Sequence, residues 1–142
     1  MTKPTKLITH QDYCRSVLAL IIKHAKLSPE ERIAAEHMTL SYSISLDEAT
    51  YGVTFQAGWK LPKLVAGKLK RRKPAKPKAS EDTPCCNHTW REGYAAAVGI
   101  IARGDETPCQ LATTVAHELG HVIVGPGHGH SAIWREACER LG

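Results

Sequence analysis

The sequence predicts a small α+β domain in which helices precede and follow a short antiparallel β-sheet. Near the N-terminus, two stretches open with helix-capping residues and continue with apolar residues at helical spacing. In the middle of the chain, apolar and polar residues alternate as they do in half-buried strands. The last third contains two further helical segments. A length of 142 residues suits one domain with a single core.

Two helices are expected at the N-terminal end. The first covers residues 9 to 26 and opens with Thr9 and Asp12 in a capping box. Its expected core-facing side carries Tyr13, Val17, Leu20, Ile21 and His24. The second helix begins at Ser28 by the same capping logic and ends near Met38.

Three strands are expected next. The first two carry an apolar residue at every second position, Tyr42, Ile44 and Leu46 in one and Tyr51, Val53 and Phe55 in the other. Residues 47 to 50 between them predict a turn, so that the two strands form a hairpin. The third strand covers residues 94 to 103, an apolar segment that ends just before another helix.

That next helix, expected over residues 107 to 124, is sharply delimited. Thr107 stands at the N-cap, Gln110 completes a capping box three positions later, and Gly125-Pro126 ends the helix. Apolar residues recur along it at helical spacing, namely Leu111, Val115, Leu119, Val122 and Ile123. The histidines within it therefore lie on a well-defined helix.

The same helix contains His117-Glu118-Leu119-Gly120-His121, the signature of a zinc peptidase. Two histidines four residues apart lie on one face of a helix, so both imidazoles can hold one ion. Glu118 stands beside the first histidine and can accept a proton from a water molecule on that ion, the role of a general base. We therefore expect Zn²⁺ as the cofactor, although Mn or Co can occupy the same ligands.

The chain continues with His128-Gly129-His130 and a last helix predicted from Ser131 to the end. The histidine motif, the short glycine-containing turn, a Gly-His step followed four residues later by Trp134, and the final Leu-Gly resemble the SprT-like metallopeptidases of bacteria and phages. Their eukaryotic relatives include Spartan, a protease that acts on DNA-bound proteins. The resemblance covers residues 90 to 142. It implies a zincin-like minimal metalloprotease fold with N-terminal helices, a small antiparallel sheet, the HExxH helix and a C-terminal helix.

In that family the third zinc ligand is the histidine of a Gly-His-Gly-x-x-aromatic segment that opens the last helix. Measured back from Trp134, the match in this sequence is Gly129-His130. Measured by the Gly-His-Gly triplet alone, the match is Gly127-His128. The resemblance implies His130, because the aromatic residue and the Leu-Gly ending both keep their spacing from it. His128 is the alternative third ligand.

Other groups of the expected site are named by proximity in sequence alone. Tyr94, His128 and Trp90 are candidates for stabilising an oxyanion. Asp105, Glu106 and Glu136 are candidates for accepting hydrogen bonds from the ligand imidazoles. The strand expected just before the histidine helix is where zinc peptidases commonly hold an extended substrate by edge pairing.

Positive charge is concentrated in one stretch. Residues 60 to 78 contain nine Lys and Arg and no acid, whereas the rest of the chain has ten basic and fourteen acidic residues. Its prolines favour a flexible insertion, at about 60 to 84, within a single domain of residues 1 to 142. Such a segment attracts nucleic-acid phosphates, or else is a solvated insertion that keeps the chain soluble. The candidate DNA-binding residues are Lys68, Lys70, Arg71, Arg72, Lys73, Lys76 and Lys78.

The leading hypothesis is a zinc metallopeptidase that hydrolyses peptide bonds of DNA-bound proteins, with Glu118 as the catalytic residue. One alternative is a regulatory protease of the ImmA type, which carries the same helix motif and cleaves a partner repressor. The other is a non-catalytic nucleic-acid-binding module with structural zinc, for which Glu118 has no use. Five cysteines in no disulfide framework and the lack of an apolar leader favour a cytoplasmic protein without a membrane partner. The protein is expected to be a monomer, with a protein substrate and DNA as its partners.

Overall fold

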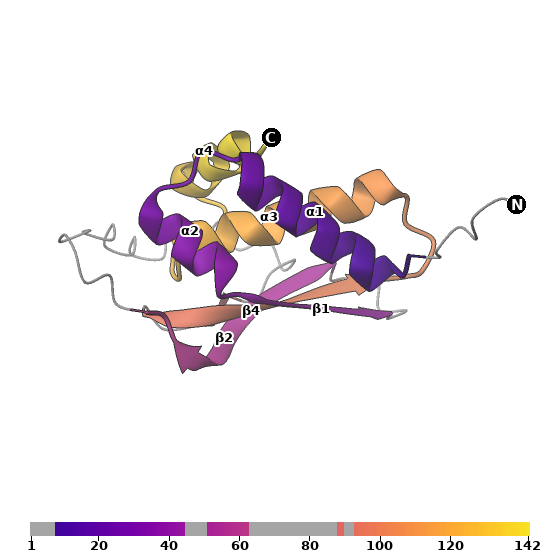
Figure 1. Ribbon diagram of the computed structural model, residues 1–142, viewed down its shortest axis with the longest axis horizontal. Helices are drawn as coiled ribbons and strands as arrows, with labels where there is room; N and C mark the ends of the chain where they lie inside the picture. The colour runs from indigo at the N-terminus through magenta and orange to yellow at the C-terminus, as the bar shows by residue number, and fades with distance from the viewer. Residues whose placement is uncertain (1–7, 45–50, 63–87, 90–92) are drawn as a thin grey trace, which may run out of the picture.

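The computed structural model describes residues 8–44, 51–62, 88–89 and 93–142. In these residues, four helices lie on one side of a small mixed β-sheet (Figure 1), and α3 packs against the other three helices and against β2 and β4. The α+β class expected from the sequence is confirmed. The flexible basic insertion expected at about 60 to 84 lies, beyond residue 62, outside the described residues.

The four helices begin where the sequence placed capping residues. They are α1 (His10–His24), α2 (Pro29–Glu36), α3 (Pro108–Val124) and α4 (Ala132–Leu141). Ser28 and Thr107 form complete capping boxes at the starts of α2 and α3, and Thr9 accepts a hydrogen bond from the Asp12 amide at the start of α1. Ser131 occupies the N-cap of α4, but its side chain makes no capping hydrogen bond.

The sheet is mixed, so the expectation of an antiparallel sheet is wrong. Its strands are β1 (Thr39–Ile44), β2 (Gly52–Lys60), the two-residue β3 (His88–Thr89) and β4 (Tyr94–Ala102), in the order β1-β4-β2-β3. Strand β4 pairs parallel with β1 and antiparallel with β2. The expected hairpin of β1 and β2 does not form, because β4 lies between them.

The composition of β4 explains its central place. Every residue from Ala95 to Ala102 is buried or half-buried, which suits a strand that is paired along both edges. The serine-rich β1 takes an edge of the sheet instead. Because both edges of β4 are already paired, an extended substrate cannot pair with it, and the expected edge pairing at this strand is wrong.

The strand register determines which residues face the helices. Leu40 pairs with Val98, and both side chains are buried in the core that the helices share. On the same face of β2 lie Gly52 and Thr54, which are buried against α3. Val53 therefore points to the opposite face, where it meets Gly99. Tyr51, just before the strand, is 49% exposed.

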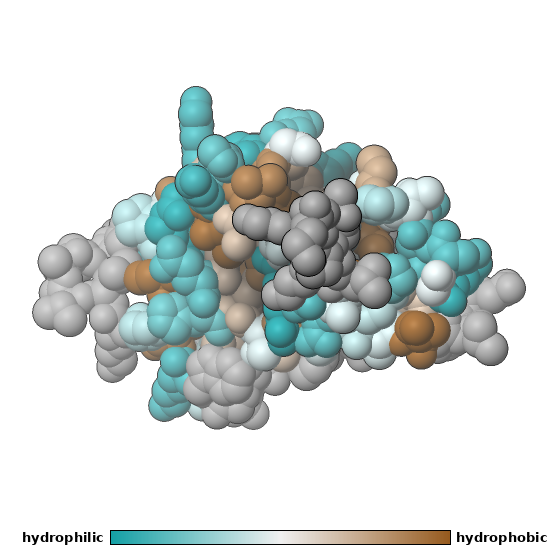
Figure 2. Space-filling view, turned by 45° about the vertical axis from the view of Figure 1, so that its right-hand side comes forward, coloured by the Kyte–Doolittle hydropathy of each residue, from teal (hydrophilic) through white to brown (hydrophobic). Residues whose placement is uncertain are grey.

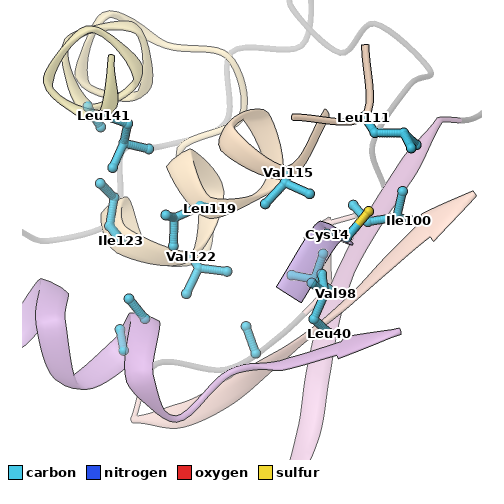
Figure 3. Close-up of a cluster of buried hydrophobic side chains, with 14 of the residues drawn as sticks. Cys14, Leu40, Val98, Ile100, Leu111, Val115, Leu119, Val122, Ile123 and Leu141 are labelled. Atoms are coloured by element: carbon cyan, nitrogen blue, oxygen red, sulfur yellow. The ribbon is translucent and has the colours of Figure 1, made fainter. Parts of the chain in front are cut away.

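One hydrophobic core joins the helices to the sheet (Figure 3). Leu119 and Val122 of α3 point into it from above the sheet, and Cys14 of α1 is completely buried there. The core-facing side of α1 is therefore centred on Cys14. Leu20, expected on that side, is 60% exposed. The difference is a rotation of about one residue around the helix, since each residue turns the side chain direction by about 100°.

On the described surface, the large exposed apolar side chains are few. In the view of Figure 2, hydrophobic atoms lie in separate patches between hydrophilic ones. The exposed large apolar side chains among the described residues are Ile8, Leu20, Ile44 and Tyr51. None of the helices in the described ranges has the length and apolar character that crossing a bilayer requires.

An ion pair ties the last helix to the start of α2. Arg140 donates two parallel hydrogen bonds to the Glu31 carboxylate, at 3.0 and 2.7 Å, and a third to the Lys26 carbonyl at 3.2 Å. Partial burial raises the pKa of Glu31, but the hydrogen bonds from Arg140 and Ser28 and the Arg140 charge outweigh it and hold the pKa below its ordinary value. The stabilisation is therefore present above the ordinary carboxyl pKa and is lost as the pH falls through the lowered one.

We expect Glu31→Gln to lower the free energy of unfolding by about 1 kcal/mol at pH 7, with the difference from wild type shrinking below about pH 4. Glutamine still accepts the Ser28 amide hydrogen bond in a capping box, so the loss isolates the pair with Arg140. Urea unfolding at pH 7 and pH 3 measures it, with Glu30→Gln as the control for charge on the same helix turn. A loss that is equally large at pH 3 contradicts the assignment.

Candidate metal centre

The second half of α3 is buried on nearly every side. Its faces contact the hydrophobic core, β2 and α4. Its core face, with Leu119 and Val122, covers the sheet. Glu118 lies against β2, where Thr54 donates a hydrogen bond to it. The remaining face, with His117, Gly120 and His121, meets α4.

Three histidines converge where α3 meets the segment before α4. The Nε2 atom of His117 lies 3.3 Å from that of His121 and 3.1 Å from that of His130. One ligand nitrogen from each of the three residues lies within 4.8 Å of the others. His121 is 1% exposed, while His117 and His130 are half-buried. The group can therefore hold a metal ion.

These spacings suit a tetrahedral zinc site. Bonds of about 2.0–2.1 Å at tetrahedral angles place neighbouring ligand nitrogens about 3.3 Å apart. The two Nε2 separations of 3.1 and 3.3 Å match that value. Among the described residues, the group has three ligands, which leaves one tetrahedral position without a protein ligand. The donor set consequently fits zinc, and equally fits other divalent ions that accept imidazole ligands.

A glycine-rich turn brings His130 to the two helical histidines. Gly125 ends α3 with a φ of 86°, and Gly127 has a φ of 83°, values that side chains with a Cβ rarely adopt. The chain reverses there, and the Ser131 amide donates to the His128 carbonyl at 3.1 Å before α4 begins. The result places His130 in the three-histidine group, whereas His128, 5% exposed, is not a member of it.

The electrostatics favour a neutral imidazole at His117. Burial, and to a smaller extent the neighbouring His130, lower the pKa of His117 to about 4. A neutral imidazole keeps the lone pair that a metal ion needs, so His117 is ready to act as a ligand at neutral pH. Burial raises the pKa of the nearby Cys138 thiol to about 11, which keeps this sulfur protonated at neutral pH.

Glu118 is held from the sheet side by two residues of β2. Its side chain is 1% exposed, and its Oε2 atom accepts a hydrogen bond of 2.5 Å from the buried Thr54 hydroxyl. Gly52 leaves the space that the carboxylate occupies, because a Cβ on Gly52 would lie 2.5 Å from Oε1 and 2.8 Å from the carboxyl carbon. Strand β2 thus fixes the position of the carboxylate that stands next to the first histidine.

Neither β2 residue was among those predicted from the sequence. Gly52 and Thr54 are small or polar, and they alternate with Tyr51 and Val53, so their face looked like the solvent face of the strand. A glycine inside an alternating strand is nevertheless a sign of close approach by another group. That sign could have pointed to Gly52, but nothing in the sequence names Glu118 as the group that approaches it.

The other residues predicted for the site lie apart from the three histidines. Glu106 accepts hydrogen bonds from the Arg103 and Gly104 amides in the turn before α3, about 15 Å along the helix from the histidines. Glu136 is exposed on α4. Tyr94 lies at the start of β4, four residues from the partner of Thr54, which is about 13 Å along the strand.

Some of the predicted residues lie outside the described part of the chain. Trp90 and the seven basic residues from Lys68 to Lys78 lie outside it. Asp105 is described and is exposed in the turn that precedes α3. Of the residues predicted for the site, the structure therefore brings together His117, His121 and His130. Glu118 follows His117 on the same helix, with its carboxylate against β2.

Comparisons of the chain with protein-family models, with curated proteins and with solved structures found no match. The functional argument consequently depends on the geometry of this site and on the chemistry of its residues.

Proposed function

We propose that this protein is a zinc-dependent metallopeptidase, similar in its active site to the SprT-like enzymes. The observation that carries the proposal is the convergence of three histidine ligand nitrogens. The next residue in sequence after the first of these histidines is Glu118, whose carboxylate β2 holds in place. Three protein ligands with a fourth position left for solvent are typical of catalytic zinc, whereas structural sites usually have four protein ligands. The fixed position of Glu118 further favours catalysis over a structural site.

A bound zinc ion supplies Lewis acidity and makes water acidic enough to lose a proton near neutral pH. His117, His121 and His130 would hold the ion. Glu118 takes the proton from the attacking water and later passes it to the leaving amine of the peptide. Thr54 orients Glu118 by donating a hydrogen bond to Oε2, and Gly52 leaves the space that the carboxylate occupies beside β2.

We further propose that the basic stretch of residues 60 to 78 localises the enzyme on DNA, so that DNA-bound proteins are its substrates. The charge distribution supports this, because the positive excess of the whole chain comes from that stretch. Neutralising phosphates with lysine and arginine releases counterions and gives binding without sequence preference. The predicted partners are thus a protein substrate and DNA.

A cleavage assay tests the proposed activity. The purified chain is incubated with casein as supplied, after removal of metal with a chelator, and after zinc is added back. We expect cleavage that the chelator abolishes and that zinc restores. Casein that stays intact in the zinc-loaded protein, both with and without DNA, contradicts the peptidase proposal. Zinc binding without any cleavage would instead favour a nucleic-acid-binding module with structural zinc.

The DNA proposal makes a separate prediction. Replacing Lys68, Lys70, Arg71, Arg72, Lys73, Lys76 and Lys78 by serine should weaken DNA binding and flatten its salt dependence, since each lost phosphate contact removes about 0.9 from the slope of log K against log salt. Fluorescence anisotropy with a labelled duplex at several salt concentrations measures the slope. An unchanged slope contradicts a role of this stretch in DNA binding and leaves the ImmA-type alternative, cleavage of one partner protein.

A further inference from the structure

Trp134 of α4 contacts all three histidines of the metal centre. Its ring centroid lies 4.7 Å from that of His117, 5.1 Å from that of His121 and 4.6 Å from that of His130. The three imidazole centroids are each 5.0 Å apart. The four rings therefore form a compact cluster in which Trp134 is the only member that is not a candidate ligand.

The contacts differ in geometry and so restrict the imidazoles in different ways. The indole is stacked on His121, with 21° between the ring planes, and it meets His117 and His130 edge-on at 65° and 66°. Both arrangements are favourable for aromatic rings. A rotation of any of the three imidazoles away from the common centre would break its contact with the indole.

The indole is itself fixed from behind. A Cβ on Gly120 would lie 2.9 Å from its Nε1 atom and 3.4 Å from its Cδ1 atom, so this edge of the ring rests on the backbone of α3. The glycine in the histidine motif is what allows this close approach. The ring is consequently wedged between the α3 backbone and the three histidines.

Hydrogen bonding does not account for a tryptophan at this position. The Nε1 atom of Trp134 is buried and has no hydrogen-bond partner among the described residues. A buried donor without a partner costs stability, and a smaller aromatic residue such as phenylalanine would avoid that cost. The large indole surface, which reaches three rings at once, remains as the feature that distinguishes tryptophan here.

We propose that Trp134 is a positioning residue that holds the three imidazoles in their converging orientation before the metal binds. Ligand side chains that are ordered in advance lose less conformational freedom on binding, so the metal is bound more tightly. The effect acts through the ligands, and Trp134 itself does not touch the ion. The inference depends on the metal centre of the proposed function but not on peptide hydrolysis.

Metal affinity tests the proposal without any substrate. Zinc dissociation constants are measured by competition with a chromophoric chelator for the wild type, Trp134→Leu and Trp134→Phe, and the visible absorption of bound Co²⁺ reports the geometry. We expect the zinc Kd to rise about 10–100-fold in Trp134→Leu, the range for residues that support metal ligands, with a smaller rise in Trp134→Phe. The Co²⁺ spectrum should change in both variants.

Leu141→Ala is the matched control, because Leu141 is a buried residue of the same helix and is not among the ring contacts. It should keep the wild-type zinc affinity while it destabilises α4. Wild-type affinity in Trp134→Leu, or an equal loss of affinity in Leu141→Ala, would overturn the proposal. A wild type that binds neither ion overturns the metal centre as well, whereas intact zinc binding without proteolysis counts against the proposed function alone.

Discussion

Replacing Glu118 by glutamine is expected to lower peptide hydrolysis by about 10²–10⁴-fold, the usual contribution of a general base. Glutamine has nearly the same shape and can still accept the hydrogen bond from Thr54, so the strand contact and the fold should persist. It cannot accept a proton from water at neutral pH. The histidines are unchanged, so the variant should retain wild-type zinc content.

The measurement is the rate of casein cleavage at matched zinc content, and circular dichroism verifies the fold. Glu136→Gln is a suitable control, because Glu136 is exposed on α4 and the same change of charge there should leave the rate unaltered. Equal rates for wild type and Glu118→Gln would remove Glu118 from the mechanism. A loss of zinc together with activity would show that the carboxylate supports the metal site instead.

Gly52→Ala is expected to lower hydrolysis by about 10²-fold, although the substitution adds only one methyl group. The new Cβ would overlap the Glu118 carboxylate, with 2.5 Å to Oε1 and 2.8 Å to the carboxyl carbon. The end of a glutamate side chain can move, so the fold should tolerate the change while the carboxylate shifts. A displacement of about 1 Å at a catalytic group costs on the order of 10²-fold in rate.

Gly99→Ala provides the matched control for this prediction. Gly99 is the β4 partner of Val53, on the face of the sheet opposite to Glu118, and a Cβ there would meet the Val53 side chain at 3.1 Å. Its effect should be confined to thermal stability. Rates and melting temperatures of both variants separate the two cases, and a Gly52→Ala enzyme as active as Gly99→Ala contradicts the positioning role of β2.

Much of the helical structure was predictable because its signals are local. Thr9, Ser28 and Thr107 mark helix starts through hydrogen bonds to residues three positions away, and the structure contains these bonds. Gly125 stops α3 where a residue with positive φ is needed. Such features depend on a few neighbouring residues and do not require knowledge of the fold.

The sheet was less predictable, because strand order depends on distant segments. The short polar stretch after β1 predicted a hairpin, but the apolar β4 takes the centre and separates β1 from β2. The same long-range effect determines which face of β2 is buried. Thr54 is buried because Glu118, 64 residues away in sequence, lies opposite it and accepts its hydrogen bond.

The candidate site shows the same division. His117 and His121 could be assigned as ligands from their spacing on one helix. The choice of His130 over His128 as the third ligand depended on a family resemblance. The geometry groups His130 with the other two. Gly52, Thr54 and the contacts of Trp134 became visible only in three dimensions, since they connect β2 and α4 to the middle of α3.

The central claim is that three imidazoles hold one catalytic metal ion. The zinc content of single-histidine variants tests it most directly. Wild type, His128→Ala and His130→Ala are purified in parallel, checked for folding by circular dichroism, and analysed for metal by mass spectrometry. The geometry predicts about one zinc ion per chain in wild type and in His128→Ala, and none in His130→Ala. Full zinc content in His130→Ala, or a wild type without zinc after exposure to it, would contradict the account.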